Sequence, residues 1–144
     1  MKTVADLLGT KKAAVWSTTP DTSVFDALTM MAEKNVGALP VLENDRLVGI
    51  FSERDYARKI ILKGKSSRET SVREIMTARV ISISPGETIE RCMALMTEKH
   101  FRHLPAVEND RLIGIISIGD VVKSVIEEQE ATISHLQGYI TGQR

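Results

Sequence analysis

The sequence is poor in the features that mark secreted and nucleic-acid-binding proteins. It has a single cysteine, Cys92, which excludes an internal disulfide and favours a reducing compartment. Its 19 basic and 19 acidic side chains balance to a net charge of zero. General nucleic-acid binders carry a basic excess, and attraction to an anionic membrane needs one too, so neither partner is expected.

Long apolar runs are also missing. The longest, residues 36–42, contains Gly37 and Pro40 and is far shorter than the roughly 20 residues of a membrane-spanning helix. The first residues, Met1–Asp6, contain no apolar stretch typical of a secretory signal. We therefore expect a cytoplasmic protein, and its 144 residues suit one domain.

What the sequence does contain is an internal duplication. At an offset of 65 residues, segment 15–55 aligns without a gap on segment 80–120, and 17 of the 41 aligned pairs are identical. The densest block is Glu43–Leu47 against Glu108–Leu112. A register kept over this length indicates two copies of one structural unit.

Both copies predict the same order of elements. In copy one, a β-prone segment at 15–18 precedes a helix over about 23–34, whose apolar residues recur at i, i+3, i+4 and i+7. Two strands then flank the polar turn 43–46, which is a hairpin pattern, and a second helix begins near Glu53. The equivalent elements of copy two are 80–83, 88–99, the turn 108–111 and a helix from near Ile118.

A single β-α-β-β-α unit of this size could hardly bury both its sheet and its helices. Two units packed about a pseudo-twofold axis could, which predicts an α/β (α+β) fold with clefts between the copies. Residues 1–144 would form one module. Its predicted divisions are repeat 1 (15–62), a linker (63–79), repeat 2 (80–126) and a C-terminal helical extension (127–144).

One polar pattern recurs where the last strand of each copy meets the next helix. Ser52 and Asp55 follow Gly49 in copy one. Ser117 and Asp120 occupy the same places in copy two. A hydroxyl at a helix N-terminus can donate to a phosphate, and a carboxylate one turn on can accept from two ribose hydroxyls. The same pattern is also a structural helix cap, which is the alternative reading.

Together these features resemble a pair of cystathionine-β-synthase (CBS) domains, of the small stand-alone subgroup without a catalytic domain. The resemblance covers about residues 15–125. It is carried by the β-α-β-β-α unit, the Gly-x-x-Ser-x-x-Asp ends and the segments Ala38–Val41, His103–Ala106, Ser52–Tyr56, Val72–Thr77 and Arg102–Pro105. It implies a pseudo-twofold module with two clefts for adenosine compounds: AMP, ADP, ATP, S-adenosylmethionine or, in some members, NAD.

The resemblance also implies roles for individual residues. Asp55 and Asp120 would hold ribose hydroxyls, and Ser52 and Ser117 would meet phosphate. Adenine would lie against the start of each repeat and the start of each hairpin. The residues predicted there are Thr18, Pro20, Ala38, Pro40, Ile83, Pro85, His103 and Pro105.

The two copies differ at these sites. Copy one has Arg54 between its Ser and Asp where copy two has Gly119, and copy two has Arg102 where copy one has Gly37. The planar guanidinium of Arg102 matches phosphate oxygens, although an exposed arginine at a strand start would account for it equally. We therefore predict two nucleotide sites of unequal strength.

Four residues also have plain structural explanations. Cys92 falls on the apolar face of its helix, which predicts a buried, unreactive thiol. His100 and His103 straddle a predicted helix end without a Cys or a second His pair, so no metal site is predicted. Trp16 aligns with Ile81, so it is expected to pack in the core or a cleft; a place beside adenine is the alternative.

Beyond repeat 2, apolar positions are spaced alternately by four and three residues, as in a coiled coil. They are Val122, Ile126, Gln129, Ile133, Leu136 and Ile140, with the polar Gln129 interrupting the seam. This predicts a helix through which two copies form a homodimer. Packing against the protein's own sheet or against residues 4–8 is the alternative.

The sequence thus predicts a non-catalytic regulatory module that binds an adenine nucleotide and signals to an unidentified protein partner. No catalytic residue and no metal are expected, because no nucleophile–base pair or ligand cluster is visible. One alternative is a protein-interaction regulator, for example of a thioredoxin-type partner, with weak or no nucleotide dependence. The other is an enzyme that uses Cys92 or a histidine.

Overall fold

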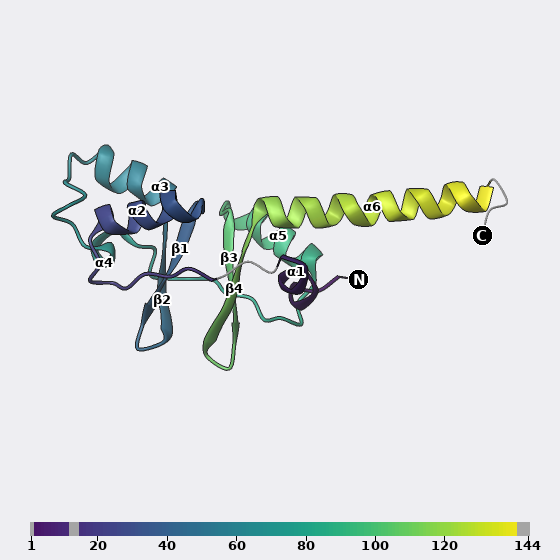
Figure 1. Ribbon diagram of the computed structural model, residues 1–144, viewed down its shortest axis with the longest axis horizontal. Coiled ribbons are helices and arrows are strands. Elements are labelled where there is room, and N and C mark those ends of the chain that lie inside the picture. The colour runs from purple at the N-terminus through teal and green to yellow at the C-terminus, as the bar shows by residue number, and fades with distance from the viewer. Residues whose placement is uncertain (1, 12–14, 141–144) are drawn as a thin grey trace.

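The computed structural model describes residues 2–11 and 15–140. Two repeats lie side by side, each an antiparallel hairpin with helices packed against it, and the last helix projects away from both (Figure 1). The elements in chain order are α1 (Val4–Lys11), α2 (Val24–Lys34), β1 (Ala38–Glu43), β2 (Arg46–Ser52), α3 (Glu53–Tyr56), the π-helical turn η1 (Ala57–Ile61), α4 (Val72–Ile75), α5 (Ile89–Lys99), β3 (His103–Glu108), β4 (Arg111–Ser117) and α6 (Ile118–Ile140).

Helices α2 and α5 confirm the predicted helices and have matching ends. The side-chain oxygens of Ser23 and Thr88 accept a hydrogen bond from the backbone amide three residues on, at 3.1 and 3.2 Å. Both helices stop at a residue in the left-handed conformation, Asn35 and His100, with φ of 54° and 58°. Their inward faces are buried: Val24, Ala27 and Met31 in α2, and Ile89, Cys92 and Met96 in α5.

The two hairpins also form as predicted. Each turn has two central residues with positive φ, 53° and 63° at Asn44–Asp45 and 52° and 62° at Asn109–Asp110. Two successive positive φ angles match the right-handed twist of the flanking strands, and Asn and Asp adopt them readily. The resulting register pairs Ala38 with Ser52 and His103 with Ser117, so each hairpin ends at the serine of its Ser-x-x-Asp pattern.

The predicted first strand of each repeat is reduced to one parallel bridge. Thr18 pairs with Val41, and Ile83 pairs with Ala106, so each sheet has two strands rather than three. Proline explains the short pairing, because a residue without an N–H cannot donate to a ladder. Pro40 and Pro105 precede the paired residues in β1 and β3, and each instead accepts a hydrogen bond through its carbonyl at 3.0 and 2.9 Å.

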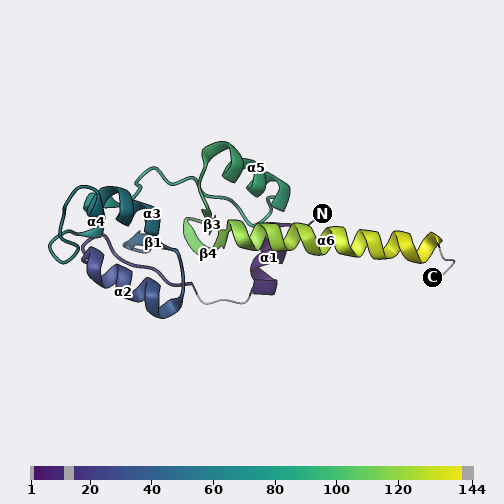
Figure 2. The ribbon, with the colours of Figure 1, turned by 90° about the horizontal axis from the view of Figure 1, so that it is seen from above.

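Each repeat lends its leading helix to the other. Helix α1 packs with repeat 2, where Val4 and Leu7 are buried in the same core as Cys92 (Figure 2). Helix α4 lies within the predicted linker and packs with repeat 1, where Val72 and Ile75 are buried beside α2. Each exchanged helix covers hydrophobic surface that the receiving repeat would otherwise expose to water.

Helix α6 packs on repeat 2 only along its first turns. There Val121 is fully buried and Ser124 is 5% exposed, whereas Val122 and Ile126 on the other face are 45% and 47% exposed. The projecting half carries Ile133 and Leu136, both 54% exposed. The predicted seam therefore lies on solvent rather than on the protein's own sheet.

Among the described residues, no helix is both long and apolar enough to cross a lipid bilayer. Met1, residues 141–144 of the predicted extension and the side chain of Ile140 lie outside the described part of the structure.

Candidate nucleotide site

Two clefts lie between the repeats, near the place where β2 and β4 approach each other. Each cleft combines the Ser-x-x-Asp pattern of one repeat with the start of the other repeat and of its hairpin. We name them the Asp55 cleft and the Asp120 cleft after the carboxylates that line them. Their volumes, about 560 and 400 Å³, fall in the range of small-ligand sites.

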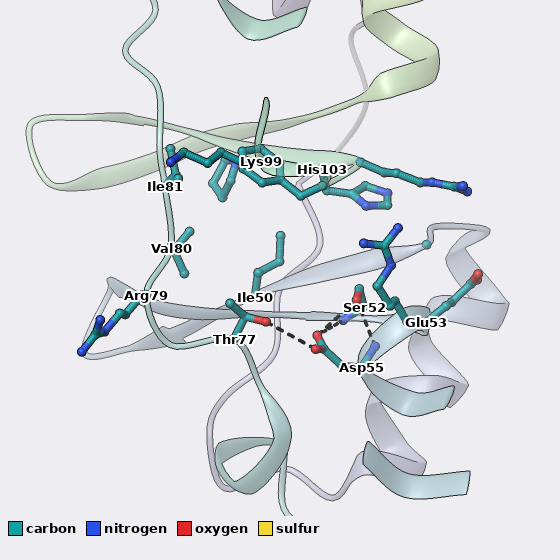
Figure 3. Close-up of a pocket in the computed structure, with 15 residues that line it drawn as sticks. Ile50, Ser52, Glu53, Asp55, Thr77, Arg79, Val80, Ile81, Lys99 and His103 are labelled. Atoms are coloured by element: carbon teal, nitrogen blue, oxygen red, sulfur yellow. Dashed lines mark hydrogen bonds between the residues drawn. The ribbon is translucent and has the colours of Figure 1, made fainter. Parts of the chain in front are cut away.

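In the Asp55 cleft, repeat 1 and repeat 2 form facing walls. Ser52, Asp55 and Thr77 lie on one wall, and Lys99 and His103 lie on the other (Figure 3). The full lining is Gly37, Ile50, Ser52, Glu53, Arg54, Asp55, Thr77, Arg79, Val80, Ile81, Lys99, Phe101, Arg102, His103 and Pro105. The apolar members could contact a base, while the cations could meet phosphate.

Asp55 is held firmly at the start of α3. Its Oδ2 accepts from the backbone N–H and the hydroxyl of Ser52 at 3.0 and 3.1 Å, and the Asp55 amide donates back to the Ser52 hydroxyl. Its Oδ1 accepts from Thr77 at 3.3 Å and lies 3.2 Å from the Lys59 ammonium. The pattern is thus a capping box, as the structural alternative proposed, and it lines a cleft as well.

The Asp120 cleft repeats this arrangement with different surroundings. The Ser117 amide donates to Asp120 Oδ2 at 2.9 Å, and the Asp120 amide donates to the Ser117 hydroxyl at 3.1 Å. The Lys34 ammonium lies 4.1 Å from the centre of the Trp16 ring at the cleft wall, a cation–π contact. The full lining is Trp16, Lys34, Asn35, Val36, Gly37, Ala38, His103, Ile115, Ser117 and Asp120.

Basic side chains are distributed unequally between the clefts. Four lysine and arginine residues line the Asp55 cleft: Arg54, Arg79, Lys99 and Arg102. Among the described residues that line the Asp120 cleft, Lys34 is the one lysine and there is no arginine. Arg54 also ties the repeats together, because its Nη1 donates to the carbonyl oxygen of His100 at 2.8 Å. A ligand with several negative charges is therefore better matched by the Asp55 cleft.

Known proteins share this architecture. Residues 4–62 and 72–127 each match the family described as "CBS domain". The chain is a member of the CBS-domain family. Its CBS pair includes α1 and α4, because both matched segments begin with the exchanged helices. The predicted resemblance and the α+β fold are confirmed.

Individual relatives support this assignment. The CBS domain-containing protein CBSX3, mitochondrial, of Arabidopsis thaliana is 43% identical, with 97% of this chain and 72% of that protein covered. A solved protein with CBS domains from Burkholderia ambifaria MC40-6 has a TM-score of 0.84 and 48% identity, covering 89% of this chain and 96% of its own. A hexameric CBS-CP12 protein from bloom-forming cyanobacteria has a TM-score of 0.71 and 28% identity, covering 76% and 61%.

Family membership defines the broad class of function. Stand-alone CBS-domain proteins are in general regulatory or signal-transduction modules rather than catalysts. CBS domains bind adenine-nucleotide ligands, and members of the family assemble into oligomers. The chain therefore belongs to a family of regulatory modules.

The two clefts bring together nine of the fourteen residues predicted for nucleotide binding. The Asp55 cleft contains Ser52, Arg54, Asp55, Arg102, His103 and Pro105. The Asp120 cleft contains Ala38, Ser117 and Asp120, and it shares His103. Because His103 contributes to both linings, the clefts are neighbours across the start of β3.

The other five predicted residues, at the bridges and turns of the CBS pair, line neither cleft. Thr18, Pro40 and Ile83 are buried at the parallel bridges. Pro20 and Pro85 anchor the exchanged helices, since their carbonyl oxygens accept from the amides of Arg73 and Ala5, both at 2.9 Å. These five residues thus belong to the structure around the clefts rather than to their linings.

Several residues near the clefts were not among the predicted set. Thr77, Arg79 and Lys99 line the Asp55 cleft, and Lys59 holds its carboxylate from behind. One signal was available, because Lys34 and Lys99 are identical residues at equivalent helix ends of the duplication. Arg79 and Lys59 have no such signal in the sequence. Their places beside the Asp55 cleft follow only from the packing of α4 on repeat 1.

The remaining polar candidates lie apart from both carboxylates. Cys92 is fully buried in the repeat 2 core, and burial raises the pKa of its thiol. His100 ends α5 in the left-handed conformation and contributes its backbone carbonyl to Arg54. Among the described residues, no group of three or more His, Cys, Asp or Glu side chains is placed to hold a metal ion.

Proposed function

We propose that this CBS pair is a regulatory module that binds an adenine nucleotide between its repeats and carries out no reaction itself. The observation that supports it is the cleft pair, in which each Ser-x-x-Asp pattern faces the start of the other repeat. A ligand held there contacts both repeats at once. Its binding would favour one relative position of the repeats, which a partner protein could sense.

The chemistry of the linings suits the three parts of a nucleotide. In the Asp55 cleft, Arg54 and Arg102 would bind phosphate, and apolar side chains such as Val80 and Ile81 would contact the base. The two carboxylates would accept hydrogen bonds from ribose hydroxyls, as acidic residues do in other nucleotide folds. AMP, ADP and ATP are the first ligands to consider, followed by NAD and S-adenosylmethionine.

Calorimetric titration of these five compounds into the purified protein tests the proposal. We expect at least one adenine nucleotide to bind with saturable heat. Trp16 is the sole tryptophan and lines the Asp120 cleft, so its fluorescence reports that cleft separately. Mass spectrometry of small molecules that co-purify would identify the natural ligand. A protein that binds none of the five compounds, by heat or by fluorescence, overturns the nucleotide proposal.

A homodimer with an additional protein partner completes the proposed function. The exposed apolar face of α6, formed by Val122, Ile126, Ile133 and Leu136, supports association of two copies. We expect the protein to act in the cytoplasm. The word mitochondrial in the name of the Arabidopsis thaliana relative makes organelle targeting the alternative to test by localisation of a tagged chain.

The same exposed face supports a second candidate function. A projecting helix with apolar side chains on solvent could bind a regulated protein, such as a thioredoxin-type partner, without nucleotide. A variant in which both serines and both carboxylates of the clefts are replaced by alanine separates the two functions. Partner binding that survives these four substitutions favours the interaction function over the nucleotide sensor.

A further inference from the structure

Lys59 lies behind the Asp55 carboxylate, outside the cleft lining, and connects it to the exchanged helix α4. Its ammonium is 3.2 Å from Asp55 Oδ1 and donates a hydrogen bond to the carbonyl oxygen of Ile75, the last residue of α4, at 2.9 Å. It comes from the π-helical turn η1 directly after α3. Such turns are rare and occur frequently at functional sites.

With Lys59 in place, both oxygens of Asp55 are already engaged. A carboxylate offers about four lone-pair positions on its two oxygens. Ser52 donates two hydrogen bonds to Oδ2, Thr77 donates one to Oδ1, and the Lys59 ammonium forms an ion pair with Oδ1. The side chain is only 10% exposed. A ribose hydroxyl must therefore compete with Thr77 and Lys59 for Asp55 Oδ1.

The duplication provides an internal comparison for Lys59. At the 65-residue offset of the duplication, Lys59 corresponds to Ser124, a buried neutral side chain whose Oγ has no hydrogen-bond partner among the described residues. At the 68-residue offset that aligns Val4–Leu8 with Val72–Met76, Thr77 corresponds to Gly9, which has no side chain. The two residues that engage Asp55 Oδ1 thus differ in type from their counterparts in the other copy.

We propose that Lys59 is a positioning residue that makes the Asp55 cleft select the phosphate end of a ligand over its ribose. This inference rests on the proposed nucleotide function. The ammonium opposes ribose binding by occupying Oδ1. It favours phosphate because it neutralises Asp55, whose negative charge would otherwise repel a phosphate among Arg54 and Arg102.

The test uses two ligands that separate these effects. Adenosine has the ribose hydroxyls and no charge, whereas inorganic tripolyphosphate has the charge and no ribose. Both are titrated calorimetrically into the wild-type protein and into Lys59→Ser, which copies the residue type of repeat 2. We expect adenosine to bind about threefold to tenfold more tightly to the variant and tripolyphosphate to bind less tightly by a similar factor, since a partly exposed ion pair is lost.

Three controls assign these changes to Lys59. Lys59→Arg keeps the positive charge and should restore the wild-type preference. Ser124→Ala alters the equivalent position of repeat 2 and should leave both titrations of the Asp55 cleft unchanged. Trp16 fluorescence should show the same adenosine response in Lys59→Ser as in the wild type, because it reports the other cleft. Lys59→Met, which keeps the aliphatic stem, provides a second variant if Lys59→Ser unfolds.

The two ligands must respond in opposite directions. If both bind more weakly to Lys59→Ser and Lys59→Met, or if neither changes, Lys59 only stabilises the fold and the inference is overturned. That result would leave the proposed function intact, provided the wild type binds AMP or ATP. A wild type that binds neither adenosine, AMP nor ATP overturns the proposed function and this inference with it.

Discussion

At the scale of single residues, the Ser-x-x-Asp pattern has two roles that are usually treated as alternatives. Ser52 and Asp55 form a reciprocal helix cap, and the same two side chains line a cleft between the repeats. Each contact that caps the helix also fixes the direction of the carboxylate. Capping therefore holds the carboxylate in place at the cleft, so little entropy is lost when a ligand binds, although the ligand must compete with the contacts already made to Asp55.

Removing either carboxylate should weaken a nucleotide site while leaving the fold intact. A carboxylate that accepts from two ribose hydroxyls makes charge-assisted bonds, so its loss should cost about 1–3 kcal/mol, roughly a tenfold to hundredfold loss of affinity at that site. For Asp55→Ala we expect a loss at the lower end of this range, because a ribose hydroxyl competes there with Thr77 and Lys59 for the carboxylate. Calorimetry with AMP and ATP measures both, with circular dichroism as the control for folding. If neither substitution alters the titration of a nucleotide that binds, both patterns are helix caps only.

Cys92 should behave as a structural thiol. It is fully buried, and burial raises the pKa of the thiol, so the reactive thiolate is scarce at neutral pH and becomes accessible only when the core opens. Labelling by a bulky thiol reagent should therefore be slow in the native protein and fast in denaturant, at pH 7 and below. Cys92→Ser should leave nucleotide affinity unchanged and lower stability by about 1–3 kcal/mol, because it buries a hydroxyl. Rapid native labelling would instead indicate a reactive cysteine.

At the scale of secondary-structure elements, exchange of α1 and α4 depends on two strand glycines. A Cβ at Gly49 would lie 2.6 Å from Met76 Sδ and 3.0 Å from the Thr77 carbonyl oxygen. A Cβ at Gly114 would lie 2.6 Å from Leu8 Cδ2, with only side-chain atoms of Leu8 nearby. Both strands thus need glycine where the exchanged helix approaches. A Cβ would meet a backbone atom only at Gly49, because the neighbours of Gly114 are side-chain atoms.

Gly49→Ala should therefore destabilise the protein more than Gly114→Ala. Overpacking against atoms that cannot move typically costs about 1–3 kcal/mol, whereas the Leu8 side chain can rotate away from the Gly114 site. Urea denaturation monitored by circular dichroism measures the difference. Gly86→Ala is the matched control, because a Cβ there has no neighbour within 4 Å. Equal stability of all three variants would show that the exchanged helices do not depend on close approach.

The elements differ in how well the sequence predicts them. Local chemistry defines the helices and hairpins: Ser23 and Thr88 begin helices, and Asn-Asp pairs make the turns. The strands expected at 15–18 and 80–83 shorten to single bridges, because pairing depends on the proline in the neighbouring strand rather than on the segment's own propensity.

The helix exchange was harder to predict. Val4–Leu8 and Val72–Met76 share a pattern, but at an offset of 68 residues rather than 65, so the gapless alignment ends before it reaches them. The candidate site shows the same limit. Both Ser-x-x-Asp patterns were found from the sequence, whereas Lys59 and Arg79 acquire roles only through the tertiary placement of α4.

At the scale of the whole molecule, the outer part of α6 extends away from the two repeats, and none of its described residues belongs to their cores. Its inner face, with Val121 and Ser124, packs on repeat 2, while Val122 and Ile126 face solvent on the opposite side. Farther out the helix leaves the body of the protein and keeps the same apolar spacing (Figure 1). Exposed apolar side chains in heptad spacing are stabilised when a second helix covers them.

We therefore predict a homodimer joined through α6. Light scattering at micromolar concentration should give about twice the chain mass of 15.9 kDa. The double variant Ile133→Lys with Leu136→Lys should shift the protein to a monomer, because two charges per helix would be buried at the interface without partners. Ala131→Lys, which adds a lysine on the side of α6 opposite the seam, should remain dimeric. A dimer that persists in the double variant would place the contact elsewhere on the CBS pair, and a wild-type monomer, with and without nucleotide, would overturn the prediction.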